Sequence, residues 1–325
     1  KTQNRGGVGQ KSAGTRDQDF LEHLFVATNH QYLMYFTQKG KCYWMRVYEI
    51  PEGTKTSKGR AIQNLINIES DDKVKAFICT QDLKDQDYIK SHNLIMVTKQ
   101  GQVKKTSLEK YSKPRVNGVA AITIKEGDEL LGAKLTNGSS QVLIAGKSGK
   151  MVRFEEEKTR PMGRTASGVR GITLADDKDE VIGIVTVNKE DVNETQILVV
   201  TENGYGKRTK LVEEDGVDVY RITNRGGKGV KTLNITEKTG ALIAINNVTD
   251  DDDLMIINKS GLTIRMMVSD LRVMGRATQG VRLINIKGND SIAAVTKVLR
   301  EEETEGDNLN EEPENGTDIE TNLDD

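Results

Sequence analysis

The sequence predicts an all-β fold made of propeller-like blades, each about 50 residues long. A basic, glycine-dense loop recurs along the chain, most clearly as TNRGGKGVKTLNI at residues 223–235. Aligned on the last glycine of each loop, six copies follow one another at intervals of about 50 to 60 residues, at Gly9, Gly59, Gly118, Gly168, Gly229 and Gly280. A period of this size is typical of propellers and other repeat architectures.

Five β-hairpins accompany the loops. Each consists of two apolar runs joined by a turn that contains glycine, which accepts the positive φ that such turns need. The expected hairpins cover residues 33–47, 94–108, 142–154, 197–211 and 254–268, with turn glycines Gly40, Gly101, Gly149, Gly204 and Gly261. Because six loops but five hairpins are visible, we expect the hairpin before Gln3 to be missing from the start of the chain or supplied by another segment.

Two further strands complete each repeat. The first follows the glycine loop, as in Val119–Ile124 and Val281–Ile286. The second is a separate apolar segment, found at Val74–Cys79, Leu130–Leu135, Val181–Val187, Leu242–Val248 and Ile292–Val298. Four strands in about 50 residues match one blade of a propeller.

Composition narrows the class of protein. Hydrophobic residues make up 35% and aromatic residues 4% of the 325 residues, so the cores must consist mainly of Val, Ile and Leu. Cys42 and Cys79 lack metal-ligand spacing and do not suggest a disulfide framework, which favours a reducing, cytoplasmic location. No apolar run reaches about 18 residues, so no membrane span is expected. The chain starts at Lys1 without a signal-like segment, and we expect it to be part of a longer protein.

Charge is distributed unevenly along the chain. Residues 301–325 carry 12 of the 49 acidic residues and none of the 47 Lys and Arg, which leaves residues 1–300 with ten excess positive charges. We therefore predict one domain over residues 1–299, with its first blade incomplete at the N-terminus, and a disordered acidic tail over 300–325. A basic body favours a polyanionic partner, with which the tail could compete. The four aspartates Asp250–Asp253 are interpreted as a solvated loop rather than a Mg²⁺ site.

Signatures of catalysis are absent from the sequence. His23, His30 and His92 show neither metal-ligand spacing nor a nucleophile partner, and they are interpreted as surface or packing residues. The stretch GGKGVKT at 226–232 resembles a phosphate loop, but its glycines are in the wrong register. We therefore predict no catalytic residue, no metal and no cofactor for this chain.

Binding residues are better represented. Glycines let backbone N–H groups approach a phosphate, and flanking Arg and Lys supply positive charge. The predicted DNA-binding residues of the loops are Gln3, Arg5, Gly6, Gly7, Gly9, Lys58, Arg115, Arg164, Arg170, Asn224, Arg225, Gly226, Gly227, Lys228, Gly229, Lys231, Arg276 and Arg282. Those of the hairpins are Lys104, Lys105, Lys207 and Arg208. Repeated in each blade, they would form a basic rim. The alternative is that each Arg-x-x-x-Gly is a structural turn.

These motifs resemble the C-terminal domain of the DNA gyrase A subunit. The similarity rests on QNRGGVG (3–9), TNRGGKGV (223–230), the pair MGRTASGVRGI and MGRATQGVRLI, and the KSGK and KSGL hairpins. It extends to about residue 299 and is greatest with the Bacteroidetes-type version. The family's box is usually written QRRGGKG. Here Asn4 replaces an Arg and Val8 a basic residue, so the first loop is not expected to dominate DNA binding alone.

The resemblance implies a six-bladed β-pinwheel whose neighbouring blades exchange strands. It also implies that double-stranded DNA wraps with positive handedness around the basic rim, so that gyrase introduces negative supercoils at the expense of ATP. The implied partners are the gyrase A N-terminal region and gyrase B in an A2B2 heterotetramer. The cleavage tyrosine, the ATP site and Mg²⁺ would belong to the rest of that enzyme.

Three other assignments remain open from the sequence. The C-terminal domain of topoisomerase IV is the nearest, but it usually has fewer blades and degenerate boxes. A protein-recruiting propeller should show apolar or acidic rim loops. A propeller enzyme would need a nucleophile or a metal set.

Overall fold

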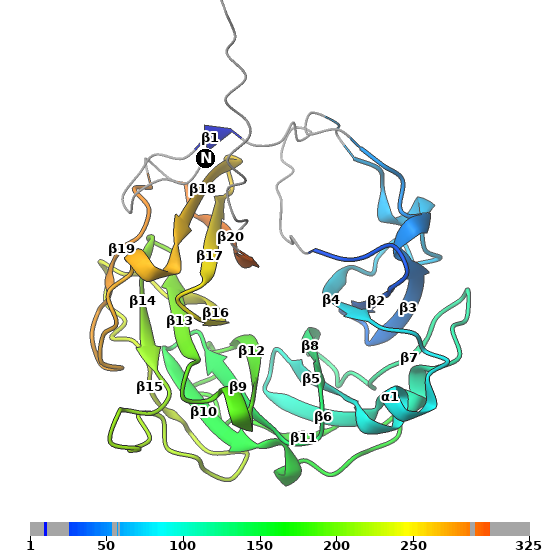
Figure 1. The fold of residues 1–325 in the computed structure, drawn as a ribbon, viewed down its shortest axis with the longest axis horizontal. Coiled ribbons are helices and arrows are strands. Elements are labelled where there is room, and N and C mark those ends of the chain that lie inside the picture. The colour runs from blue at the N-terminus through cyan, green and yellow to red at the C-terminus, as the bar shows by residue number, and fades with distance from the viewer. Residues whose placement is uncertain (1–9, 12–25, 54–56, 58, 287–289, 300–325) are drawn as a thin grey trace, which may run out of the picture.

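The computed structural model describes residues 10–11, 26–53, 57, 59–286 and 290–299. These residues form five four-stranded antiparallel sheets, which follow one another in an arc like the blades of a propeller (Figure 1). The all-β, bladed architecture is confirmed. The predicted number of six blades is wrong for the described residues, which hold five.

All five predicted hairpins are confirmed. Their turn glycines have φ between 78° and 84°, in the left-handed region that side chains resist. The hairpins are β2 (Tyr32–Thr37) with β3 (Lys41–Arg46), β5 (Asn93–Thr98) with β6 (Gln102–Ser107), β9 (Ser140–Gly146) with β10 (Lys150–Glu155), β13 (Gln196–Thr201) with β14 (Tyr205–Lys210), and β17 (Asp252–Asn258) with β18 (Leu262–Met267).

The separate apolar segments form the inner strand of each sheet. They are β4 (Val74–Thr80), β8 (Leu130–Thr136), β12 (Val181–Asn188), β16 (Leu242–Val248) and β20 (Ile292–Leu299). Each pairs with the first strand of its own hairpin and lies toward the centre of the arc (Figure 1). Successive inner strands contact one another in chain order, and buried residues dominated by Val, Ile and Leu pack between neighbouring sheets.

The outer strand of each sheet comes from a different repeat. Four short strands that follow the glycine loops pair with the hairpin one repeat before their own: β7 (Val119–Ala120) with β3, β11 (Val169–Arg170) with β6, β15 (Val230–Lys231) with β10, and β19 (Val281–Arg282) with β14. At the other end of the chain, β1 (Gln10–Lys11) pairs with β18. These outer strands are shorter than the six-residue segments predicted, and neighbouring blades exchange them.

The exchange explains how six loops accompany five hairpins. Each loop after Gly59 completes the sheet of the hairpin one repeat earlier, not of the hairpin directly before it in the chain. The loop anchored on Gly59 follows the first described hairpin, so no hairpin one repeat earlier lies among the described residues. Its continuation contains the 3₁₀ helix η2 (Ile62–Asn64) instead of a strand. Ile66 and Ile68 pack with Leu33, Tyr35 and Tyr43 on the first sheet. The apolar part of this repeat therefore covers a sheet face rather than extending a sheet edge.

A helix and several short turns were not predicted. The helix α1 (Gln86–Ser91) is capped by Asp85, whose Oδ1 accepts hydrogen bonds from the N–H groups of Asp87 and Tyr88 at 3.0 and 3.1 Å. The remaining 3₁₀ turns are η1 (Val47–Glu49), η3 (Leu108–Tyr111), η4 (Glu156–Lys158), η5 (Lys189–Asp191) and η6 (Val268–Asp270). No helix in the described part of the chain is long and apolar enough to cross a membrane.

The prediction of a solvated loop is correct for Asp250 and Asp251, which are exposed in a turn, and wrong for the rest of the aspartate run. Asp252 and Asp253 begin strand β17 and are buried. The carboxylate of Asp253 accepts a hydrogen bond from Arg265 Nε at 2.7 Å, and Asp252 lies 3.6 Å from Lys297 Nζ. Asp250 pairs with Arg208. Arginine and lysine side chains from the sheets hold these carboxylates, and no group of three or more metal-ligating residues occurs among the described residues.

Candidate nucleic-acid interface

The loop of residues 221–231 shows how a glycine loop sits on the hairpin of the preceding repeat, here β9 and β10. The Thr223 N–H donates to Arg153 O at 2.8 Å and the Thr232 N–H to Gly149 O at 2.8 Å, so the loop is fixed at both ends to β10 and its turn. Between these points Gly229 adopts φ 72°, and a Cβ there would lie 2.6 Å from Met151 O. Gly229 is thus required by close packing.

Gly227 lies in the same loop but is not closely packed. Alanine substitutions at Gly227 and Gly229 therefore test whether close packing requires Gly229. A Cβ at Gly227 would meet no atom closer than 3.8 Å. Gly229→Ala is therefore expected to lower the free energy of unfolding by about 2–4 kcal/mol, through left-handed strain and the shift of Met151. Gly227→Ala should stay within about 1 kcal/mol of the wild type. Urea unfolding measures both, and equal stability of the two variants would refute the packing role of Gly229.

A cavity of about 450 Å³ lies between this loop and β10. Asn224, Arg225 and the run Gly226–Val230 line one side, and Met151, Val152 and Arg153 line the other. The backbone N–H groups of Gly227 and Lys228 have no hydrogen-bond acceptor within the described residues. Free N–H groups beside lysine and arginine side chains suit a phosphate oxygen.

Successive glycine loops are tied to one another. The residue five positions after an anchor glycine donates a hydrogen bond to the next loop along the chain. Thr123 N donates to Ala166 O at 3.3 Å, Thr173 N to Gly227 O at 2.9 Å, and Asn234 N to Thr278 O at 3.1 Å. We call the linked segments 113–120, 160–170, 221–231 and 272–282 the loop belt. The outer strands that it contains lie along the periphery of the arc (Figure 1).

Exposed basic side chains follow the loop belt. Among the predicted residues, Arg115, Arg170, Asn224, Lys228, Lys231 and Arg282 are exposed. Residues Arg170, Lys231 and Arg282 occupy the same position, two residues after the anchor glycine, on β11, β15 and β19. No ion pair links these cations to an acidic residue of the described chain. Their charge is available to a ligand.

The arginines four residues before the anchor glycine have a mixed role. Arg164, Arg225 and Arg276 are half-buried, as are Gly226, Gly227 and Gly229. The guanidinium of Arg225 donates from Nε to Lys158 O at 3.0 Å and from Nη1 to Arg170 O at 3.3 Å. These two hydrogen bonds hold the loop in place, as the structural-turn alternative predicts. That alternative is therefore correct in part for Arg225.

A second column of cations escaped the sequence analysis. Lys110, Arg160, Arg221 and Arg272 each lie eight residues before an anchor glycine, and all four are exposed. None of them forms an ion pair with a carboxylate in the structurally described part of the chain. Their fixed spacing to the anchor glycine is a signal that an alignment of the loop copies could have used.

The four predicted hairpin cations are buried, which corrects their assignment to an exposed rim. The side chains of Lys104, Lys105, Lys207 and Arg208 are enclosed because the loop of the next repeat covers the second strand of each hairpin. Arg208 donates to Leu271 O and pairs with Asp250. Lys104 and Lys207 donate to carbonyl oxygens of the covering loops. None of these groups can reach DNA directly.

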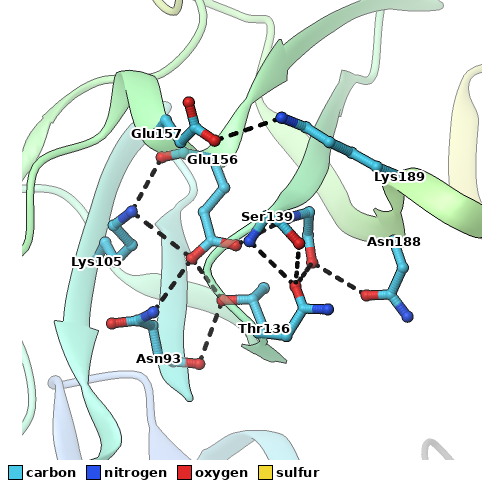
Figure 2. A network of polar contacts seen from close by, with 10 residues as sticks. Asn93, Lys105, Thr136, Ser139, Glu156, Glu157, Asn188 and Lys189 are labelled. Atoms are coloured by element: carbon cyan, nitrogen blue, oxygen red, sulfur yellow. Dashed lines mark hydrogen bonds and ion pairs between the residues drawn. The ribbon is translucent and has the colours of Figure 1, made fainter. Parts of the chain in front are cut away.

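Figure 2 shows the buried network around Lys105. Its Nζ donates to Glu156 O at 3.2 Å and lies 3.6 Å from the Glu156 carboxylate. That carboxylate, fully buried, also accepts from Thr136 Oγ1 at 2.8 Å and from Ser140 N at 3.2 Å. A buried charge needs this degree of pairing. Lys105 thus connects its own sheet to the turn that follows the next hairpin.

Three lysines outside the loop belt, Lys99, Lys147 and Lys189, are neutralised by acidic neighbours. Lys99 Nζ lies 2.9 Å from the Glu180 carboxylate, which also lies 3.8 Å from Lys147 Nζ. Lys189 pairs with Glu155 and Glu157 at 3.2 and 3.3 Å. No basic residue of the loop belt forms an ion pair with a carboxylate among the described residues, whereas these three lysines outside it do. The predicted Gln3, Arg5, Gly6, Gly7, Gly9 and Lys58 lie outside the described residues.

Six segments that cover most of the chain match one protein family. The family model, described as DNA gyrase C-terminal domain, beta-propeller, matches residues 1–28, 31–81, 92–137, 140–188, 195–249 and 252–298. The chain belongs to the DNA gyrase C-terminal domain family. The six matched segments of this gyrase domain correspond to the six glycine loops, whereas hairpins occur in the last five.

Sequence relatives agree with the gyrase assignment. The DNA gyrase A subunit of Staphylococcus epidermidis is 42% identical over 304 residues, which are 93% of this chain and 32% of that protein. The DNA gyrase A subunit of Staphylococcus aureus is 41% identical over 305 residues, 94% of this chain and 33% of that protein. The chain thus spans about a third of the length of the curated relatives it matches.

Solved structures share the fold. The structure of a DNA gyrase A C-terminal domain aligns with a TM-score of 0.72 at 22% identity, over 92% of this chain and 93% of that one. The C-terminal domain of DNA topoisomerase IV aligns with a TM-score of 0.70 at 23% identity, over 83% of this chain and 80% of that one. At these identities the similarity is one of fold.

Proposed function

We propose that this gyrase C-terminal domain binds double-stranded DNA along the loop belt and bends it around the periphery of the blades. The unpaired cations on linked loops are the observation that carries the proposal. Arg170, Lys231 and Arg282 repeat at one position of successive blades, so a polymer with regularly spaced phosphates can contact each of them in turn.

The expected mode of binding is contact with phosphates rather than with bases. Loop N–H groups and Arg or Lys side chains address the DNA backbone, which fixes position without reading sequence. The one α-helix of the described residues, α1, has six residues and lies outside the loop belt. Specificity is therefore expected to come from how easily a sequence bends.

The role in the whole enzyme follows from family membership. We propose that the wrap is positive and that DNA gyrase uses it to introduce negative supercoils in an ATP-dependent reaction. In this scheme the chain acts with the gyrase A N-terminal region and gyrase B as an A2B2 assembly in the bacterial cytoplasm. The chain contributes DNA binding, whereas the cleavage tyrosine, ATP and Mg²⁺ belong to the rest of the enzyme. A sixth blade and a Bacteroidetes-type origin stay predictions.

Salt dependence tests the proposed DNA binding. The affinity of the 325-residue chain for a duplex is expected to fall steeply with salt, with log K decreasing by about 0.9 per decade for each neutralised phosphate. Duplexes of unrelated sequence should give similar slopes. A salt-independent affinity, or strong preference for one sequence, would count against phosphate contact as the mode of binding.

A topoisomerase IV-type domain is the alternative, favoured by the fold similarity to that domain. The sense of wrapping separates the two assignments. Closed circular DNA relaxed by a nicking-closing enzyme in the presence of the chain should carry positive supercoils once protein is removed. Relaxed product, despite saturating binding, would favour the alternative.

A further inference from the structure

Two buried lysines lie directly beneath loops of the belt. Lys104 on β6 and Lys207 on β14 have no exposed surface. The Nζ of Lys104 donates to the carbonyl oxygens of Arg164 and Ala121, and the Nζ of Lys207 donates to Gly275 O. In each case the side chain extends from the sheet to the loop that covers it.

The fold does not need lysine at this position. Both lysines occupy the third place after the turn glycine of their hairpin, and the same place holds Val152 on β10 and Ile264 on β18. Those apolar residues are buried in equivalent sheets. Burying an ammonium group is costly, whereas burying Val or Ile is favourable. Packing therefore does not explain the lysines.

The loops above these positions suggest the explanation. The loop above Val152 carries a surface cation, Lys228, immediately before its anchor glycine. In the loops above Lys104 and Lys207, that residue is Ser167 or Gln279. In these two blades the sheet beneath the loop provides a cation that the loop lacks. The loops anchored on Gly118 and Gly9 carry neither.

We propose that Lys104 and Lys207 are positioning residues that place positive charge under two DNA-contact loops, and that DNA binding causes these lysines to take up protons. The inference rests on the proposed function, since the ligand is the DNA phosphate. The lysines act through the loops, by holding the carbonyl groups beside Arg164 and Arg276 and by adding charge beneath the guanidinium groups.

The surroundings of both lysines destabilise the ammonium form relative to that of an exposed lysine. Burial and the Arg164 guanidinium lower the pKa of Lys104 to about 8, and burial and the Arg276 guanidinium lower the pKa of Lys207 to about 7. Around Arg164 lie also Tyr111, whose hydroxyl donates to Ala121 O at 3.1 Å, and Cys42. Tyr220 lies near Arg276.

A bound phosphate changes this balance. The neighbouring tyrosines and the cysteine have raised pKa values because they are buried, so they stay neutral in the range where the lysines titrate. A phosphate against Arg164 or Arg276 compensates the charge that repels the ammonium group, which raises the pKa of the lysine. Protonated lysine is then favoured in the complex, and binding becomes stronger as the pH falls.

Affinity measured against pH tests the inference. We expect the full 325-residue chain to lose affinity for a short duplex as the pH rises from about 6.5 to about 9 at constant salt. The loss should reach about tenfold for each lysine whose pKa rises by about one unit on binding. The variant Lys104→Met/Lys207→Met should bind more weakly at the acidic end and show a much flatter profile, so that the two curves converge at the basic end.

Two controls complete the experiment. Thermal melting should show both methionines accepted, as Val152 and Ile264 are in the other blades. Lys231→Met, an exposed belt cation, should weaken binding at every pH and keep the wild-type slope. Parallel profiles for the wild type and Lys104→Met/Lys207→Met would overturn the inference while leaving DNA binding intact. A wild-type chain without salt-dependent affinity would instead overturn the proposed function itself.

Discussion

Replacing Arg170, Lys231 and Arg282 together with alanine is expected to weaken duplex binding by roughly two orders of magnitude at about 0.1 M salt. The three side chains are exposed on equivalent outer strands and have no carboxylate partner in the described chain. Each is expected to neutralise about one phosphate, so the slope of log K against log salt should fall by roughly 2.7. Titration of a labelled duplex at several salt concentrations measures both quantities.

The matched control uses lysines whose side chains are also accessible but paired with carboxylates. The side chains of Lys99, Lys147 and Lys189 are 40%, 45% and 45% exposed, and each lies within 3.8 Å of a glutamate. Their triple alanine variant removes the same formal charge. We expect it to bind DNA within about threefold of the wild type, with nearly the same slope, since distant charges are screened over about 10 Å at about 0.1 M salt. Equal losses from the two variants would show that net charge, not the loop belt, governs binding.

Arg153→Ala is expected to cost about 3–5 kcal/mol of the free energy of unfolding. Arg153 is 2% exposed and joins β10 to the segment after the next hairpin. Its Nη1 donates to Tyr220 O and Asp218 Oδ1, both at 2.8 Å, and its Nε donates to Gln141 Oε1 at 2.8 Å. Removal of the guanidinium leaves a cavity and takes this donor away from the buried Gln141 and Tyr220, whereas the Asp218 carboxylate stays exposed to solvent.

The control for Arg153→Ala is the same substitution at Arg160, an exposed arginine of the loop belt. Arg160→Ala should change stability by less than about 0.5 kcal/mol, because surface substitutions rarely do more. Denaturant unfolding followed by circular dichroism gives both values. If Arg153→Ala is as stable as Arg160→Ala, the buried cations of the second hairpin strands are not inter-blade connections.

Local structure could be predicted where it depends on neighbouring residues. The turn glycines Gly40 and Gly149 stand between apolar runs, and positive φ at these sites follows from the absence of a side chain. The helix α1 was missed because its six residues are too few for a clear 3.6-residue period, although Asp85 is a good cap residue.

The predicted exposure of basic residues was wrong where a segment of another repeat covers them. Lys104, Lys105 and Lys231 are all basic residues on short strands, and nothing in the neighbouring residues separates the first two from the third. The structure buries Lys104 and Lys105 and exposes Lys231. The reason is that β11 and its loop cover β6, whereas nothing covers the outer edge of β15 in the described chain.

Residues close together along the chain were thus sufficient to predict the repeat, the hairpins with their glycine turns, and the basic character of the loops. Only the tertiary structure shows which cations are available to DNA. That choice depends on the exchange of β7, β11, β15 and β19 between blades, a set of contacts between distant segments. It places Lys228 at the surface and Lys207 beneath a loop, where burial lowers the pKa of Lys207.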